Sequence, residues 1–176
     1  GSVWSVPVCL RYPMGRRCTI VSAKRAKVRL PTRRCPAWIH PNRDARGYYY
    51  SSMSAKQLEA LARHHRELSV AEIIAVVDDI EAGIDMGHLR PGRALAVLEM
   101  LATSKDRTVT STIVGALRRI HRTVITPKTQ TAFAAFVRRT YGARARALSF
   151  HGKDRTRMEH DAQLYELVGE VGRDPV

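Results

Sequence analysis

The sequence of 176 residues has few cysteines, few aromatic residues and no long apolar run. No stretch approaches the ~18–20 consecutive apolar residues of a membrane-spanning helix, so we expect no membrane span. Three cysteines at irregular spacing argue against a disulfide-rich scaffold and against a cysteine-rich zinc site. We expect Cys9, Cys18 and Cys35 to be buried, inert thiols. With 44% hydrophobic and 26% charged residues, the composition excludes a disordered or fibrous chain.

Motifs that carry common chemistries are also missing. His64-His65-Arg66-Glu67 does not match His-Glu-x-x-His, because adjacent side chains on a helix point about 100° apart. The sequence contains no Gly-x-Ser-x-Gly, no Gly-Lys-Ser/Thr phosphate loop and no Gly-x-Gly-x-x-Gly. Asp78 and Asp79 fall inside a predicted helix, where we expect one to face solvent and the other to pair with an arginine. We therefore predict no catalytic residue and no metal ligand in this chain.

Acidic residues are nearly absent from the first third of the chain. Overall, 30 Lys plus Arg stand against 16 Asp plus Glu, a formal charge of +14. Residues 1–53 contain eleven of these cations and a single acid, Asp44. Such a basic region can contact nucleic acid, an anionic membrane or an acidic protein surface. Nucleic acid is the less favoured partner, because the Tyr48–Tyr50 cluster is not interleaved with basic residues as a stacking platform would be.

Short runs of β-forming residues, separated by turn residues, fill positions 3–53. Pro13-Met14-Gly15 predicts the first turn, and Pro7 favours an edge or bulged strand. Repeated short strands of this kind are typical of a small antiparallel sheet, and we predict a β-sandwich over residues 3–53. The five predicted strands are Val3–Leu10, Cys18–Val21, Lys27–Leu30, Ala37–His40 and Gly47–Tyr50.

From residue 54 to 176 the spacing of apolar residues becomes helical. Ser69 and Glu72 fit a capping box, in which each side chain bonds the other residue's backbone N–H. Apolar stripes three and four residues apart predict six helices that bury against one another. Their pairs are expected to stack as a superhelical, HEAT- or armadillo-like array. The fifth helix should end near Gly142, and the predicted starts are Ser54, Ser69, Pro91, Asp106, Thr126-Pro127 and Arg157.

Three segments carry a family resemblance: residues 35–50, residues 3–8, and residues 68–89 with Ser69, Glu72, Asp78 and Asp79. Together they resemble zinc aminopeptidases of the aminopeptidase N (membrane alanyl aminopeptidase) type. Residues 35–50 are similar to that family's Pro-x-Trp-aliphatic-x-Pro-Asn … Gly-Tyr-Tyr-Arg segment, and residues 3–8 are similar to an upstream Trp-x-(Ile/Val)-Pro strand. Residues 68–89 are similar to the family's helix pair after the sandwich. Tyr50 and Ile73 stand where the family commonly has arginine, so the salt bridges of those arginines are not expected here. The matching residues are Trp4, Pro7, Pro36, Trp38, Pro41, Asn42, Gly47, Tyr48, Tyr49, Ser69, Glu72, Asp78 and Asp79.

The resemblance implies a β-sandwich at 3–53 and a truncated C-terminal helical domain at 54–176. The family's His-Glu-x-x-His, downstream Glu ligand and Gly-x-Met-Glu-Asn loop are absent from this sequence. The resemblance therefore implies a non-catalytic part of a zinc aminopeptidase, without a cofactor of its own. This part would cap the active-site chamber and limit the access of peptide substrates. Its partners would be the parent's N-terminal catalytic domain and peptide substrates.

Two other interpretations remain open. One is a basic helical module that binds nucleic acid, and the other is a helical-repeat scaffold for a protein partner. Gly1-Ser2 resembles the scar of a cleaved tag. Because the N-terminus shows no signal peptide, we expect a cytoplasmic location.

Overall fold

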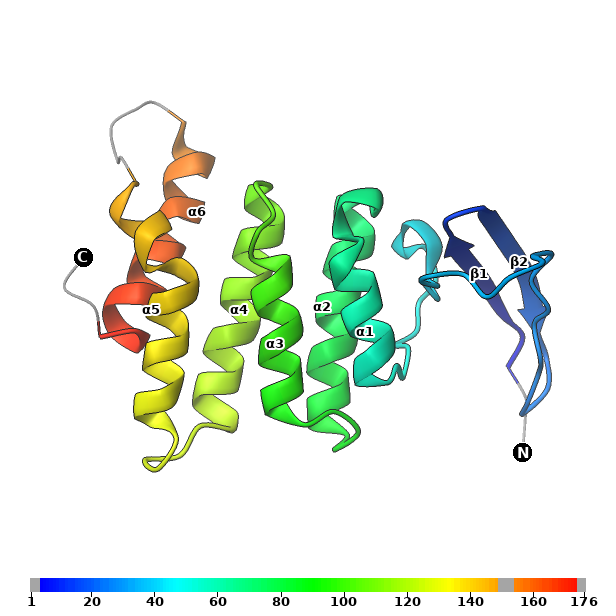
Figure 1. Cartoon of the computed structure of the whole chain (residues 1–176), viewed down its shortest axis with the longest axis horizontal. Coiled ribbons are helices and arrows are strands. Elements are labelled where there is room, and N and C mark those ends of the chain that lie inside the picture. The colour runs from blue at the N-terminus through cyan, green and yellow to red at the C-terminus, as the bar shows by residue number, and fades with distance from the viewer. Residues whose placement is uncertain (1–3, 149–153, 174–176) are drawn as a thin grey trace. The chain divides into compact units, whose positions relative to one another are not determined.

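The computed structural model describes residues 4–148 and 154–173. The chain divides into two compact units, Gly1–Leu89 and Arg90–Val176. The first contains a β-hairpin, a long coil and a helix pair, and the second contains four α-helices (Figure 1). The predicted boundary at 53/54 marks the change from strand and coil to helix. The compact units divide later, because the first helix pair belongs to the same unit as the hairpin.

The hairpin consists of β1 (Val6–Tyr12) and β2 (Gly15–Val21), paired antiparallel with Val6 opposite Val21 and Tyr12 opposite Gly15. Pro13 and Met14 form the predicted turn. Gly15 closes it with a φ of 151°, a conformation that residues with a Cβ rarely adopt. The turn and the second predicted strand are therefore confirmed. The first predicted strand is confirmed from Val6 onward, whereas Trp4 and Ser5 lie before the strand and Val3 lies outside the described residues.

The other three predicted strands are wrong. Lys27–Leu30 and Gly47–Tyr50 carry no strand structure, and of Ala37–His40 only His40 pairs, in an isolated bridge with Arg11. Pro31, Pro36 and Pro41 interrupt this region, and each removes a backbone donor that a continuous ladder would need. The described residues therefore show a two-stranded sheet followed by coil instead of the predicted β-sandwich.

The cysteine prediction is also wrong. Cys9 and Cys18 lie directly opposite each other in the hairpin and form a disulfide. A two-residue turn places residues nine positions apart across from each other, which brings the two sulfur atoms within bonding reach. Cys35 is a free, exposed thiol instead of a buried one.

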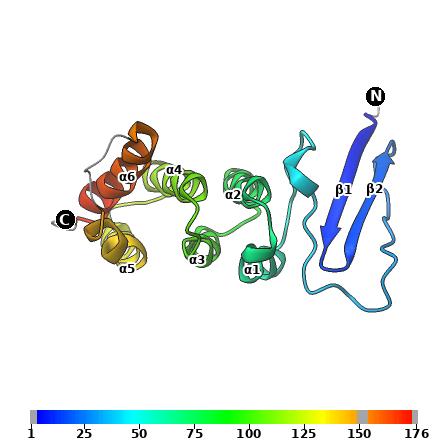
Figure 2. The ribbon, with the colours of Figure 1, turned by 90° about the horizontal axis from the view of Figure 1, so that it is seen from above.

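The helix pair of the first unit begins where the sequence predicts. Helix α1 (Ala55–Arg63) is capped by the Ser54 side chain, and α2 (Val70–Asp85) begins with a complete capping box between Ser69 and Glu72. The two helices lie side by side (Figure 2). The fully buried apolar side chains of the pair include Leu58, Leu61, Val76, Val77 and Ile80.

The second unit contains α3 (Pro91–Leu101), α4 (Arg107–Thr123), α5 (Gln130–Arg146) and α6 (Arg155–Glu166), and α6 continues into a π-helical turn, Leu167–Val171. Helix α6 packs against α4, and the π-helical turn packs against α5 (Figure 2). Pro91 occupies the first position of α3 and Asp106 caps α4, which confirms the two predicted helix starts.

Two helix ends differ from prediction. Helix α5 begins at Gln130, after a turn in which the N–H groups of Thr129 and Gln130 bond to Thr126 O, and it continues through Gly142 to Arg146. Gly142 is buried within the helix and does not end it. No helix in the described part of the chain is long and apolar enough to cross a membrane. The superhelical stacking of helix pairs stays a prediction.

The disulfide predicts the number of reactive thiols. The folded chain should show one thiol that reacts with a thiol reagent in the absence of reductant, because Cys35 is exposed and the other two cysteines are bonded. After reduction and unfolding the number should rise to all three cysteines. Mass spectrometry of the alkylated protein makes the measurement, and three reactive thiols before reduction would contradict the pairing.

Candidate functional site

A carboxylate with no solvent exposure, Glu72, lies where the hairpin and coil meet α2. Its side chain forms an ion pair with Arg11 of β1, whose guanidinium also donates to Glu67 O. The same carboxylate accepts from Ser69 N at 2.9 Å and from Asp44 N at 3.2 Å. Two segments distant in sequence, together with the N-cap of the helix itself, therefore satisfy one buried charge, as burial of an ion demands.

His40 reinforces this contact from the coil. Its backbone exchanges two hydrogen bonds with Arg11, of 2.9 and 2.8 Å. Its Nδ1 accepts from Asn42 N at 3.2 Å, so Nε2 carries the proton and donates to Glu72 O at 3.0 Å. Burial lowers the pKa of His40 below its ordinary value, which keeps the ring neutral near pH 7. His40 acts here as a fixed hydrogen-bonding group and not as a proton carrier.

The loop after His40 is closed by the amide side chain of Asn42. Its Nδ2 donates to Gly47 O at 2.8 Å, and its Oδ1 accepts from Gly47 N at 2.7 Å. Within the loop, Asp44 and Ala45 both have positive φ, 55° and 53°, which is unfavourable for residues with a Cβ. A Cβ on Gly47 would overlap the ring of Tyr49, whose hydroxyl donates to Pro41 O at 2.8 Å. The turn therefore requires both Asn42 and Gly47.

The predicted split of the aspartate pair is confirmed, but in the described part of the chain Asp79 bonds a backbone N–H instead of the predicted arginine. Asp78 is exposed, and Asp79 is buried with its Oδ1 2.6 Å from Ser51 N, which donates to it. Burial is the main cause that raises the pKa of Asp79 to about 6. Both aspartates line a cavity of about 380 Å³ with Tyr48, Tyr49 and Tyr50. Tyr50, at the family's arginine position, is 67% exposed and brings no charge to Asp79.

The remaining predicted motif residues divide into buried and exposed ones. Trp38 is 3% exposed, and the Arg11 guanidinium lies 5.8 Å from its ring centroid. Pro36 is half-buried, whereas Pro7 is exposed. Trp4 is 83% exposed and therefore does not join the buried cluster with Trp38.

Sequence reasoning missed the two residues that complete the cluster, Arg11 and His40. Arg11 lies 61 positions from Glu72, and His40 lies 32 positions from it. Neither belongs to a local motif. The signal that was available is the capping box itself, because a buried Glu72 needs a cation from elsewhere. We call Arg11, His40, Asn42 and Glu72 the junction cluster.

The junction cluster contains no activated nucleophile and no metal site. Within residues 4–148 and 154–173, no three His, Cys, Asp or Glu side chains gather closely enough to hold a metal ion. The zinc implied by the resemblance therefore has no fitting ligand set in this part of the chain. The cluster's chemistry is that of a charge-paired support that joins β1, the coil and α2.

The fold defines a class of protein in which a predominantly helical domain follows a small sheet. The coil between them contains Trp38, Asn42, Gly47 and Tyr49. Residues 38–176 match the family described as ERAP1-like C-terminal domain. The chain belongs to this family, the non-catalytic C-terminal domain of M1 aminopeptidases. None of the curated proteins compared with the chain matches it. The resemblance drawn from the sequence is thus confirmed at the level of the M1 aminopeptidase family.

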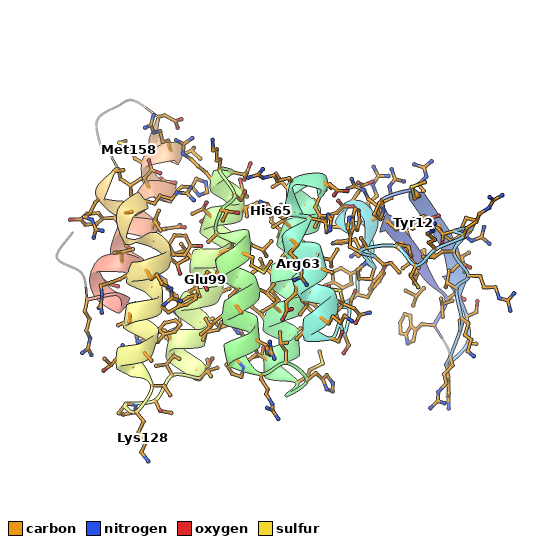
Figure 3. All side chains as sticks on the ribbon, viewed as in Figure 1. Tyr12, Arg63, His65, Glu99, Lys128 and Met158 are labelled. Carbon is orange, nitrogen blue, oxygen red and sulfur yellow. A yellow bond between two sulfur atoms is a disulfide. The ribbon has the colours of Figure 1, made fainter. Side chains whose placement is uncertain are left out.

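Removal of the buried charge should destabilise the fold strongly. Glu72→Gln leaves the Arg11 guanidinium facing a neutral amide, and we expect a loss of about 3 kcal/mol in the free energy of unfolding, measured by urea denaturation. Glu99→Gln is the matched control and should cost less than about 1 kcal/mol, because Glu99, labelled in Figure 3, lies 3.1 Å from Arg139 in an exposed ion pair. Equal losses in the two variants would show that burial does not set the cost.

Asp79→Asn should stabilise the chain at alkaline pH. An acid whose pKa is raised on folding costs stability as the pH rises from its unfolded value, near 3.8, through about 6. The variant removes that cost and keeps an oxygen for the Ser51 N–H. We expect a gain on the order of 2 kcal/mol at pH 8 and little change near pH 4. Thermal or urea unfolding at both pH values makes the comparison, and an equal effect at both would contradict the buried, charged state.

Proposed function

We propose that this chain is the C-terminal region of a zinc aminopeptidase of the aminopeptidase N type, and that it caps the active-site chamber and limits peptide access. The family match over residues 38–176 carries the proposal. Zinc, the catalytic residues and the peptide-binding loop belong to the parent's N-terminal domain in this account. The chain's own contribution is a rigid support, in which the junction cluster holds the hairpin and coil on α2.

The basic region supports a domain partner with an acidic surface. Eight Lys and Arg residues between positions 16 and 34 are exposed, and that stretch contains no acid. In the described part of the chain, the ion pairs formed before residue 53 use Arg11 and Arg43 instead. A surface with uncompensated charge of one sign fits a partner of the opposite sign. We propose that the partner surface is part of the parent's catalytic domain.

The cytoplasmic location stays a prediction, and the disulfide bears on it. Cytosolic thiols are kept reduced in most organisms, whereas disulfides persist in oxidising compartments. The Cys9–Cys18 bond therefore favours a parent that passes through such a compartment.

The activity test uses the purified chain with added Zn²⁺ and a chromogenic aminoacyl anilide. We expect no turnover above buffer, because the described residues hold no metal-binding cluster. The N-terminal region of the parent protein, produced separately, should form a stable complex with this chain, measured by co-purification. Hydrolysis by the chain alone would contradict the non-catalytic assignment.

The nucleic-acid alternative rests on the same eight exposed cations. Labelled DNA and RNA titrated at several salt concentrations should show only weak binding that fades by about 0.15 M salt. Sequence-specific binding at that salt concentration would favour the nucleic-acid module and contradict the domain-interface role.

A further inference from the structure

The second unit contains a small cavity with a strongly basic lining. Its volume is about 190 Å³, below the ~300 Å³ at which cavities for drug-sized ligands begin. Two apolar residues, Ala147 and Leu148, form part of the wall. The charged residues of the lining are Lys105, Arg107, Arg144, Arg157 and Asp161.

These charged residues come from four different segments of the unit. Lys105 lies between α3 and α4, Arg107 begins α4, Arg144 lies in the last turn of α5, and Arg157 lies in the first turn of α6. Figure 1 shows the start of α4, the end of α5 and the start of α6 at the same end of the unit. Four cations from separate elements therefore converge on one cavity.

The single carboxylate of the lining, Asp161, does not neutralise the four cations. Asp161 is 9% exposed, and its oxygens lie 3.8 Å from Arg107 Nε and 3.6 Å from Arg157 Nε. Both distances exceed the ~2.7–3.2 Å of a good N–H···O hydrogen bond, so both guanidinium groups keep donors for another acceptor. One shared carboxylate leaves the lining with a surplus of positive charge.

The neighbouring acids are committed elsewhere. Asp106 caps α4 by accepting from Val109 N at 3.0 Å, and Asp154 caps α6 by accepting from Arg157 N at 3.0 Å. Neither lines the cavity. Arg144 is held in place by a 3.2 Å hydrogen bond from its Nη1 to Ser104 O, which leaves its other guanidinium donors available.

We propose that this cavity binds a phosphate group. Three guanidinium groups and one ammonium match a small, doubly charged oxyanion, because the planar fork of arginine pairs with two phosphate oxygens at once. The cavity volume is sufficient for one such group. The site is independent of the aminopeptidase function proposed above, since it uses no residue of the junction cluster.

Inorganic phosphate is the probe, titrated into the chain by calorimetry at pH 7.5 and constant ionic strength set with NaCl. We expect saturable binding with one site and a Kd of about 1 mM or tighter. Acetate, with a single charge, should bind at least about tenfold more weakly. Absence of saturable phosphate binding, or equal affinity for acetate, would overturn the proposal.

Variants separate the site from general electrostatics. Arg157→Gln, at an exposed residue, should raise the phosphate Kd about tenfold, because a charge-assisted hydrogen bond is lost. Asp161→Asn should lower the Kd, because it removes the carboxylate that competes for the two arginines. Lys128→Gln removes one charge at the opposite end of the unit from Met158 of α6 and is the matched control (Figure 3).

The expected effects on the phosphate Kd differ: Arg157→Gln raises it, Asp161→Asn lowers it and Lys128→Gln leaves it nearly unchanged. Thermal unfolding of each variant without phosphate checks that the helices remain folded. A Kd raised as much by Lys128→Gln as by Arg157→Gln would show attraction to net charge alone and would overturn the site. An unchanged Kd in Asp161→Asn would also contradict it.

Discussion

The buried carboxylate of Glu72 is the constraint on which the first unit depends. An ion without solvent exposure must receive its hydrogen bonds from the protein, and here the donors come from β1, from the loop at Asp44 and from the start of α2. The hairpin, coil and helix pair therefore share one electrostatic centre. Two strands alone are marginally stable in water, so the hairpin needs this attachment in addition to its disulfide.

The same centre explains why an irregular coil keeps a defined shape. His40 bonds Arg11 through its backbone and Glu72 O through its ring, and Asn42 closes the next turn on Gly47. The bonds to Arg11 and Gly47 satisfy backbone groups of the coil that a regular strand would have satisfied by pairing, and the His40 ring ties the coil to α2. In this chain Asn42, Gly47 and Tyr49 therefore belong to a hydrogen-bonded loop and not to a β-strand.

Local chemistry was predictable from the sequence, and long-range pairing was not. Ser54, Ser69 and Asp106 act as caps, and Pro91 begins its helix, because each of these preferences is fixed within one turn of chain. Alternation at 27–30 and the aromatic run at 47–50 predicted strands, yet a strand also needs a partner that local pattern cannot supply. Likewise, Arg11 and His40 meet Glu72 only through the tertiary fold, and the Cys9–Cys18 bond follows from register.

Membership in the ERAP1-like C-terminal domain family identifies this chain as a C-terminal domain of the M1 aminopeptidase family. In the function proposed above, the basic stretch at residues 16–34 is a contact surface and the junction cluster is a support. The coding sequence upstream of Val3 tests this central claim most directly. The account predicts a His-Glu-x-x-His segment a few hundred codons earlier in the same reading frame. An upstream reading frame without that segment would contradict it.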